Sequence, residues 1–210
     1  MLREPLPSAA RIAQHIRGRS ILLPPSITPD FVAERLVAAL LNATRLSSVA
    51  VEVSCWEIEA FTPYQHVSVL GLSLPFLEDE ENVKRRLNAL LGELVLHKDW
   101  GGELNDLYSA HCRVRGTTMP AAFMLKGKSV PRPLQIKNCG KHGDQLLRLT
   151  DSPANLFVVQ HIDVIEQAVR RQVRMNIEAL RARDVDAYCC FIDGTQTYQL
   201  MQSASSAPTL

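Results

Sequence analysis

Apolar residues recur along the second half of the chain with two different periods, which predict helices alternating with strands. Spacings of three and four residues predict long helices over residues 77–97 and 163–183. The run Leu-Phe-Val-Val-Gln-His-Ile at 156–162 has almost no polar position, so we expect a central strand buried on both faces. Shorter patterns predict a helix at 144–149 and strands at 106–114, 120–127, 133–138, 187–193 and 197–201. This order predicts an α/β fold with a mixed central sheet flanked by helices.

The first part of the chain is predicted to be a smaller region of helix and strand. Thr28-Pro29-Asp30 has the residues of a helix start, and apolar positions after it extend the predicted helix to about residue 44. Two alternating segments, 48–56 and 64–72, predict strands that pair with each other. We therefore expect three parts: a region packed on the core at 1–76, the core at 77–202, and a disordered tail at 203–210.

Composition and charge restrict the class of protein. The net charge is only +1, so a surface that attracts nucleic acid must be local rather than a property of the whole chain. The apolar runs are far shorter than the roughly 20 residues that span a bilayer, and the N-terminus lacks the apolar segment of a signal peptide. The five cysteines include no Cys-x-x-Cys pair and predict buried free thiols, with Cys189 and Cys190 on opposite faces of a strand. We expect a cytoplasmic protein without a membrane partner.

The candidate chemistry lies between the predicted hairpin and the helix after it. Two apolar runs there end on lysines, Lys126 and Lys137. If the strand from Asp106 turns near Thr117, hairpin pairing places Asp106 opposite a position near 128, at the end where Lys126 lies. A carboxylate can hold a divalent metal, and a lysine can stabilise the charge that develops on an attacked phosphodiester. We therefore expect Asp106 and Lys126 to open on one cleft at an edge of the sheet.

With these residues the chain resembles the PD-(D/E)xK nuclease superfamily, which has the restriction-endonuclease-like fold. The core of that fold is a helix, a three-stranded meander, a helix and a further strand, and the resemblance covers roughly residues 78–165. It implies that Asp106 is the acidic residue of the second core strand. It also implies that Met-Leu-Lys, ending at Lys126, occupies the place of an acidic-x-Lys signature. The resemblance further implies Mg²⁺ or Mn²⁺ as cofactor, an extra acidic ligand in Glu93, and a polar site residue in Gln145.

The signature departs from the family pattern at Met124, because a methionine stands where a metal-binding carboxylate is expected. Three interpretations stay open. In the first, the Gln-Ile-Lys segment from Gln135 to Lys137 is the signature and Lys137 is the site lysine. In the second, Glu103 or Glu93 supplies the missing ligand. In the third, the fold is present and catalysis is lost.

The segment Gly-Lys-His-Gly-Asp-Gln before the predicted helix at 144–149 is a second candidate for phosphate contact. Glycines flank Lys141 and His142 there, so main-chain N–H groups could face a phosphate. The segment lacks the glycine spacing of a P-loop or of a dinucleotide site. We expect Lys141, His142 and Gln135 to contact nucleic acid. A binder of small phosphates or nucleotides is an alternative interpretation of this segment.

Together these patterns predict a metal-dependent nuclease subunit that cleaves phosphodiester bonds in DNA, which we place ahead of RNA, in a setting such as bacterial defence or repair. A homodimer, or a larger partner protein that supplies recognition, is expected. The alternative is a catalytically inactive nuclease-fold subunit that binds a protein partner or nucleic acid. His111 and His161 are expected to be structural histidines of the core or its rim.

Overall fold

The structure is a computed structural model that describes residues 28, 30–37, 51–93, 104–130, 133–141 and 143–202. Contacts divide the chain into two compact units, Met1–Val49 and Ala50–Leu210. In the first unit residues 30–37 are helical, and the main-chain N–H of Phe31 donates to the hydroxyl of Thr28 at 3.2 Å, which confirms the predicted helix start. The predicted end of this helix near residue 44 and the tail at 203–210 lie outside the described residues. The region 1–76, which we expected to be one part of the chain, is therefore divided, and its described residues 51–76 belong to the second unit.

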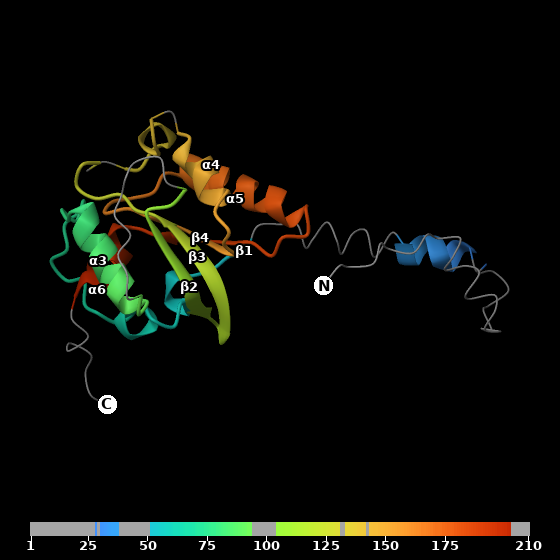
Figure 1. The fold of residues 1–210 in the computed structure, drawn as a ribbon, viewed down its shortest axis with the longest axis horizontal. Coiled ribbons are helices and arrows are strands. Elements are labelled where there is room, and N and C mark those ends of the chain that lie inside the picture. Colours follow the sequence, from blue (N-terminus) through green and yellow to red (C-terminus); the bar gives the residue numbers. More distant parts are fainter. Residues whose placement is uncertain are drawn as a thin grey trace. The chain divides into compact units, whose positions relative to one another are not determined.

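A mixed sheet forms the centre of the second unit (Figure 1). Its order within the described residues is β1-β5-β4-β3-β2, where β2 and β3 are antiparallel and the other neighbours are parallel. The strands are β1 Val51–Glu52, β2 Leu107–Val114, β3 Thr117–Met124, β4 Leu156–Gln160 and β5 Tyr188–Ile192. The predicted α/β class with a mixed sheet flanked by helices is therefore confirmed.

Helices cover both faces of the sheet (Figure 1). Helices α3 (Glu80–Leu90) and α6 (Gly194–Met201) pack on one face, and α4 (Gln145–Thr150) and α5 (Gln167–Arg181) pack on the other. Side chains alternate between these two cores along each strand, so Cys190 contacts the α3/α6 side and Cys189 the α4/α5 side, as predicted. All five cysteines are buried free thiols, as predicted.

The central strand β4 is buried along its whole length, which confirms its prediction as a strand without a polar face. It pairs with β3 on one edge and with β5 on the other. The strand ends at Gln160 rather than at residue 162. The main-chain pairing with β5 extends one residue further, because His161 N donates to Ile192 O at 2.9 Å. Hydrogen bonds and side-chain packing therefore surround this segment on every side.

The hairpin of β2 and β3 is confirmed, but its turn is tighter than predicted. Arg115 and Gly116 form the turn with φ of 48° and 80°, so Thr117 already belongs to β3. A two-residue turn with both residues in the left-handed region matches the twist of the paired strands. The strands can therefore pair directly up to this turn, and the longer predicted loop is wrong.

The register of the hairpin also differs from the prediction. Leu107 pairs with Phe123, so Asp106 lies beside the end of β3 at Met124 rather than opposite a position near 128. A bulge between Ser109 and Cys112 interrupts the ladder opposite Pro120. Proline has no N–H to donate, so an irregular stretch is the place in a sheet where it costs least.

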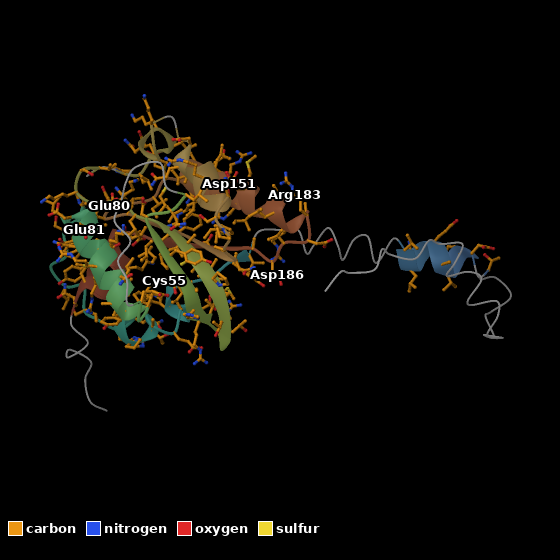
Figure 2. The ribbon with its side chains drawn as sticks, viewed as in Figure 1. Cys55, Glu80, Glu81, Asp151, Arg183 and Asp186 are labelled. Carbon is orange, nitrogen blue, oxygen red and sulfur yellow. The ribbon has the colours of Figure 1, made fainter. Side chains whose placement is uncertain are left out.

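Helix α3 is shorter than the predicted helix at 77–97. It begins at Glu80 and is followed by Gly92 with φ of +73°, while residues 94–97 lie outside the described part. Figure 2 shows Glu80 and Glu81 in its first turn, where the helix dipole favours negative charge. Gly127, just after Lys126, approaches this helix start so closely that a Cβ there would lie 2.2 Å from Glu80 N.

Three predicted strands are wrong. Residues 64–72 form no strand, because Tyr64 ends a 3₁₀ turn and most of residues 65–72 are exposed. At 133–138 a single bridge from Leu134 to Ile165 precedes a 3₁₀ helix, η3 (Ile136–Asn138). Residues 197–201 belong to α6.

Local caps explain two of the differences between prediction and structure, and a main-chain bridge explains a third. Asp193 accepts hydrogen bonds from Thr195 N and Gln196 N, and this N-cap outweighs the strand propensity of the residues after it. Helix α5 begins at Gln167, four residues later than predicted, because the main chain near Ile165 pairs with Leu134 first. Strand β1 is only two residues long, because Ser54 and Glu57 form a capping box that turns the chain into the 3₁₀ helix η1 (Cys55–Glu57).

Among the helices described here, none is both long enough and apolar enough to cross a bilayer.

Because β4 is central, we expect a leucine substitution in this strand to lower the free energy of unfolding far more than the same substitution at an exposed position. Leu156 is 0% exposed and Leu70 is 91% exposed. Leu156→Ala should lower the free energy of unfolding by about 2–5 kcal/mol because it opens a cavity in the core. Leu70→Ala should change it by no more than about 0.5 kcal/mol. Urea unfolding followed by circular dichroism measures both, and equal effects would contradict this packing.

Candidate functional site

The carboxyl-terminal ends of β3 and β4 and the start of β2 meet at one edge of the sheet. Because β2 is antiparallel to β3, Asp106, the residue before β2, lies beside the residues directly after β3. Helix α4 begins at the same edge with Gln145. We call this the β3–β4 edge, defined by Asp106, Lys126, Gln145 and Gln160.

Asp106 is held at this edge by hydrogen bonds from two other segments. Its Oδ2 accepts from Leu125 N at 2.7 Å, and its own N–H donates to Phe123 O at 2.8 Å. The side-chain amide of Gln145 donates to both carboxylate oxygens, at 3.2 and 3.1 Å. The carboxylate is therefore fixed by the residue before Lys126 and by the first residue of α4.

Side-chain alternation places Asp106 and Met124 on the same side of the hairpin. Leu107 and Phe123 contact the α3/α6 core, so their neighbours Asp106 and Met124 face the other side. Met124 is fully buried in the α4/α5 core. The position beside Asp106, to which the resemblance would assign a second carboxylate, is thus filled by an apolar side chain of the core.

The described residues do not by themselves make a site for Mg²⁺ or Mn²⁺. Among them no group of three or more histidine, cysteine or acidic side chains is arranged to hold a metal ion. Asp106 is the carboxylate that defines the β3–β4 edge, and donors from Leu125 and Gln145 already engage its oxygens. Hard cations prefer several oxygen ligands, so further ligands would have to come from substrate or from outside the described part of the chain, where Glu103 lies.

Glu93 is not brought to Asp106. Helix α3 begins at Glu80, whose N atom lies close to Gly127, so this start of the helix is near the β3–β4 edge. Glu93 follows the opposite end of the helix, which spans 11 residues and therefore roughly 16 Å. Glu93 thus lies toward the end of α3 that is distant from the β3–β4 edge.

The residues of the second candidate segment surround the start of α4. Lys137 is exposed on η3 and Lys141 is exposed in the loop after it, whereas His142 lies outside the described residues. Gln135 donates to Glu166 Oε1 at 2.6 Å and does not belong to a strand, so Gln-Ile-Lys does not have the strand context of a signature. The first N–H of α4, that of Gln145, donates to Cys139 O at 3.0 Å.

The prediction from sequence missed Gln160, which connects Lys126 to α6. Gln160 is fully buried. Its Oε1 accepts from Lys126 N at 3.2 Å, and its amide donates to the hydroxyl of Thr197 at 3.0 Å. Thr197 in turn donates to His161 O at 3.1 Å. The signal available in the sequence was a glutamine inside an otherwise apolar run.

His161 is a buried neutral histidine, in keeping with its predicted structural role. Its Nε2–H donates to Val130 O at 2.6 Å, and its Nδ1 accepts from Asp163 N at 3.1 Å. Burial lowers the pKa of His161, and the hydrogen bond to Val130 O offsets this only in part. Both ring nitrogens are engaged inside the protein, so we assign this imidazole no part in proton transfer.

His161 should make stability depend on pH below neutrality. An unfolded histidine titrates near about 6.5, whereas the pKa of His161 in the folded state is lower. Between these two values only the unfolded chain takes up the proton, so the free energy of unfolding should fall as pH falls through this window. His161→Gln should be less stable at pH 7 but should lose less stability on acidification.

The control for this prediction is His111→Gln, because His111 is exposed on β2. Thermal unfolding between pH 7.5 and 5 compares the three proteins. A His161→Gln variant whose pH dependence equals that of the unchanged chain would show that His161 is not the group responsible.

Comparison with protein-family models, with curated proteins and with solved structures found no match for this chain.

Proposed function

We propose that residues 77–202 form a nuclease-like domain of the restriction-endonuclease type that acts on DNA, with Asp106 and Lys126 at the phosphodiester group. The order α3, β2, β3, α4, β4 supports the proposal, because the family core has a helix, neighbouring antiparallel strands, a helix and a further strand. The place of the first meander strand, between α3 and β2, falls largely on residues 94–103, which lie outside the described part of the chain.

The observation that carries the proposal is the convergence of three separate segments on one carboxylate. Asp106 precedes β2, Leu125 and Lys126 come directly after β3, and Gln145 begins α4. Hydrogen bonds from Leu125 and Gln145 fix the carboxylate. A fixed arrangement of this kind is what electrostatic catalysis requires, because the groups do not have to reorganise during the reaction.

Each residue of the β3–β4 edge has a separate role in this proposal. Lys126 is half-buried, and its ammonium would stabilise negative charge on the phosphoryl oxygens. Gln145 positions Asp106, and Gln160 positions the main chain of Lys126. Lys137 and Lys141 are exposed near the start of α4 and would contact the nucleic-acid backbone. In the proposal the substrate is DNA ahead of RNA, and the working form is a cytoplasmic homodimer or a complex with a larger partner.

A second candidate function is a nuclease-fold subunit without catalytic activity, which binds a protein partner or nucleic acid. The specific observation that favours it is Met124. This side chain is fully buried at the signature position, where an acidic ligand would be expected.

Two substitutions test the proposed role of the edge. Asp106→Asn keeps an oxygen that can accept from Leu125 N but removes the negative charge, so we expect cleavage of DNA to be abolished while the fold is kept. Lys126→Ala should lower the cleavage rate by about 10²–10³, the effect of losing one preorganised contact to developing charge. The measurement is turnover of plasmid and single-stranded DNA with Mg²⁺, with Mn²⁺ and with EDTA.

The matched control for Lys126 is Lys128→Ala. Lys128 lies two residues beyond Lys126, is exposed, and forms a salt bridge with Asp79 at 2.8 Å. The loss of the Lys128 side chain should leave turnover of DNA unchanged. If the unchanged protein cleaves no nucleic acid in any of these conditions, with or without a copurifying partner, the catalytic proposal fails and the interaction-subunit candidate replaces it.

A further inference from the structure

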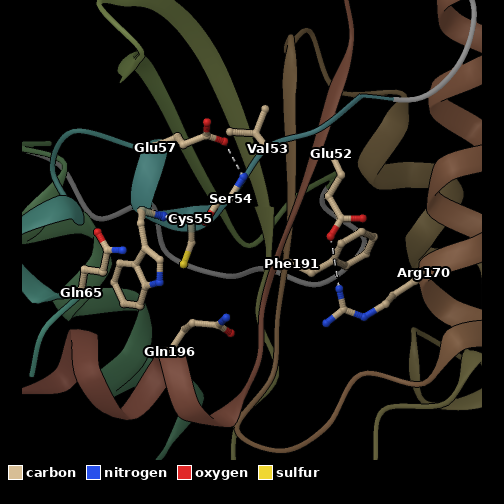
Figure 3. A pocket seen from close by; sticks show the side chains of 10 residues that line it. Glu52, Val53, Ser54, Cys55, Glu57, Gln65, Arg170, Phe191 and Gln196 are labelled. Carbon is tan, nitrogen blue, oxygen red and sulfur yellow. Dashed lines mark hydrogen bonds and ion pairs between the residues drawn. The ribbon is translucent and has the colours of Figure 1, made fainter. Parts of the chain in front are cut away.

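A pocket of about 630 Å³ lies beside β5, and the proposed role of the β3–β4 edge does not use it (Figure 3). Its lining comes from the end of β1, from η1, from α5 and from the start of α6. The pocket results from the two-residue length of β1. The ladder between these strands ends with Val53 N donating to Cys189 O at 2.8 Å, so the end of β5 at Phe191 has no neighbour from β1.

One aromatic ring, that of Trp56, and one arginine, Arg170, give the pocket flat surfaces. Phe191 is 5% exposed, and the guanidinium of Arg170 lies over its ring at 4.6 Å from the centroid. Arg170 is held in that position by Glu52 at 3.4 Å and by the main-chain carbonyl of Ile165. The half-buried ring of Trp56 lines the pocket as well. The Trp56 ring and the outer face of the Arg170 guanidinium are surfaces on which a planar heterocycle can stack, whereas the Phe191 ring is already covered by Arg170.

The side-chain amide of Gln196 is oriented by the cap of α6. Its Oε1 accepts from Asp193 N at 2.7 Å. The Nε2 donor of the same amide is therefore turned away from Asp193, and Figure 3 shows Gln196 and Cys55 on one side of the pocket and Phe191 with Arg170 on the other. Gln65 contributes a second, exposed amide to the lining. Amide groups offer donors and acceptors side by side, which matches the hydrogen-bonding edge of a nucleobase.

The charged groups of the pocket are already paired with one another or with neighbouring residues. Glu52 binds Arg170 and Arg174, the latter at 2.5 Å. Glu57 accepts from Ser54 N at 2.8 Å and forms a salt bridge with Arg115. A ligand with a large charge, or a sugar that needs free carboxylates as acceptors, would have to displace these partners. The groups left for a ligand are the flat surfaces and the amides.

The thiol of Cys55 is an uncharged part of the pocket lining. Cys55 is 2% exposed, and burial, with the charge of Asp193, raises its pKa to about 12. The thiol therefore remains protonated and contributes an inert apolar surface rather than a nucleophile.

We propose that this pocket binds a nucleobase, with the base ring stacked on its aromatic and guanidinium surfaces and the base edge hydrogen-bonded to the Gln196 amide. The size is suitable, since pockets for small molecules and cofactors have volumes of about 300–1,000 Å³. The site differs from the proposed cleavage site and does not depend on whether the β3–β4 edge is catalytic. The base can belong to a free nucleoside or to a nucleic-acid strand, and the two sources present the same ring and edge.

The test is equilibrium binding to the full chain, measured by isothermal titration calorimetry with adenosine, guanosine, cytidine and uridine, and with short single-stranded oligonucleotides. Gln196→Glu is the informative variant. Glutamate keeps the oxygen that accepts from Asp193 N, so the capping box survives, but it loses the donor that faces the base. We expect at least one base to bind the unchanged chain, and Gln196→Glu to weaken that binding by about tenfold or more.

Two comparisons make the result specific. Gln172→Glu introduces the same change on α5 outside the pocket lining and should bind as the unchanged chain does. Quenching of Trp56 fluorescence in a Trp100→Phe background, where Trp56 is the remaining tryptophan of the two in the chain, locates the ligand. Binding of nucleosides assigns the pocket to a free ligand, and binding of oligonucleotides alone assigns it to a base within a strand. No binding of either kind, equal binding by Gln196→Glu, or equal binding of ribose would overturn the proposal.

Discussion

The burial of β4 between two strands and two layers of helices is the constraint on which the rest of the structure depends. A strand surrounded in this way must satisfy its main-chain groups through β3 and β5 and must present apolar side chains to both faces. The helices α3 and α6 on one side and α4 and α5 on the other meet this requirement. Polar side chains can enter such an arrangement only at the ends of the strands, and that is where Gln160 lies.

The β3–β4 edge shows how this constraint gathers polar groups from distant parts of the sequence. Asp106 reaches the edge because β2 runs antiparallel to β3, and Gln145 reaches it because the connection to the parallel strand β4 passes through α4. Gln160 then links Lys126 to Thr197 and so to the last helix. Each contact joins segments between 19 and 39 residues apart, so the geometry of the edge is a property of the assembled sheet.

The pocket beside β5 has the opposite origin, because it exists where the sheet stops. The capping box of Ser54 and Glu57 turns the chain away after two residues of β1. A second capping box, that of Asp193 and Gln196, begins α6 after β5. These two local signals leave the end of β5 without a strand neighbour on the β1 side and place Gln196 at the opening. A feature that shortens the sheet thus provides the groups for which we propose a ligand.

The sequence by itself determined the α/β class, the central strand that begins at Leu156, the position of α4 and the buried face of α5, because apolar periodicity and caps are local properties that a pattern records directly. It also pointed to Asp106, Lys126 and Gln145, which the structure brings to one edge. Only the tertiary structure decided the hairpin register, the helical state of residues 197–201, the separation of Glu93 from Asp106, and the contacts of Gln160. The register depends on a two-residue turn and on a bulge opposite Pro120, and neither the bulge nor a pairing between distant segments leaves a periodic signal in the chain.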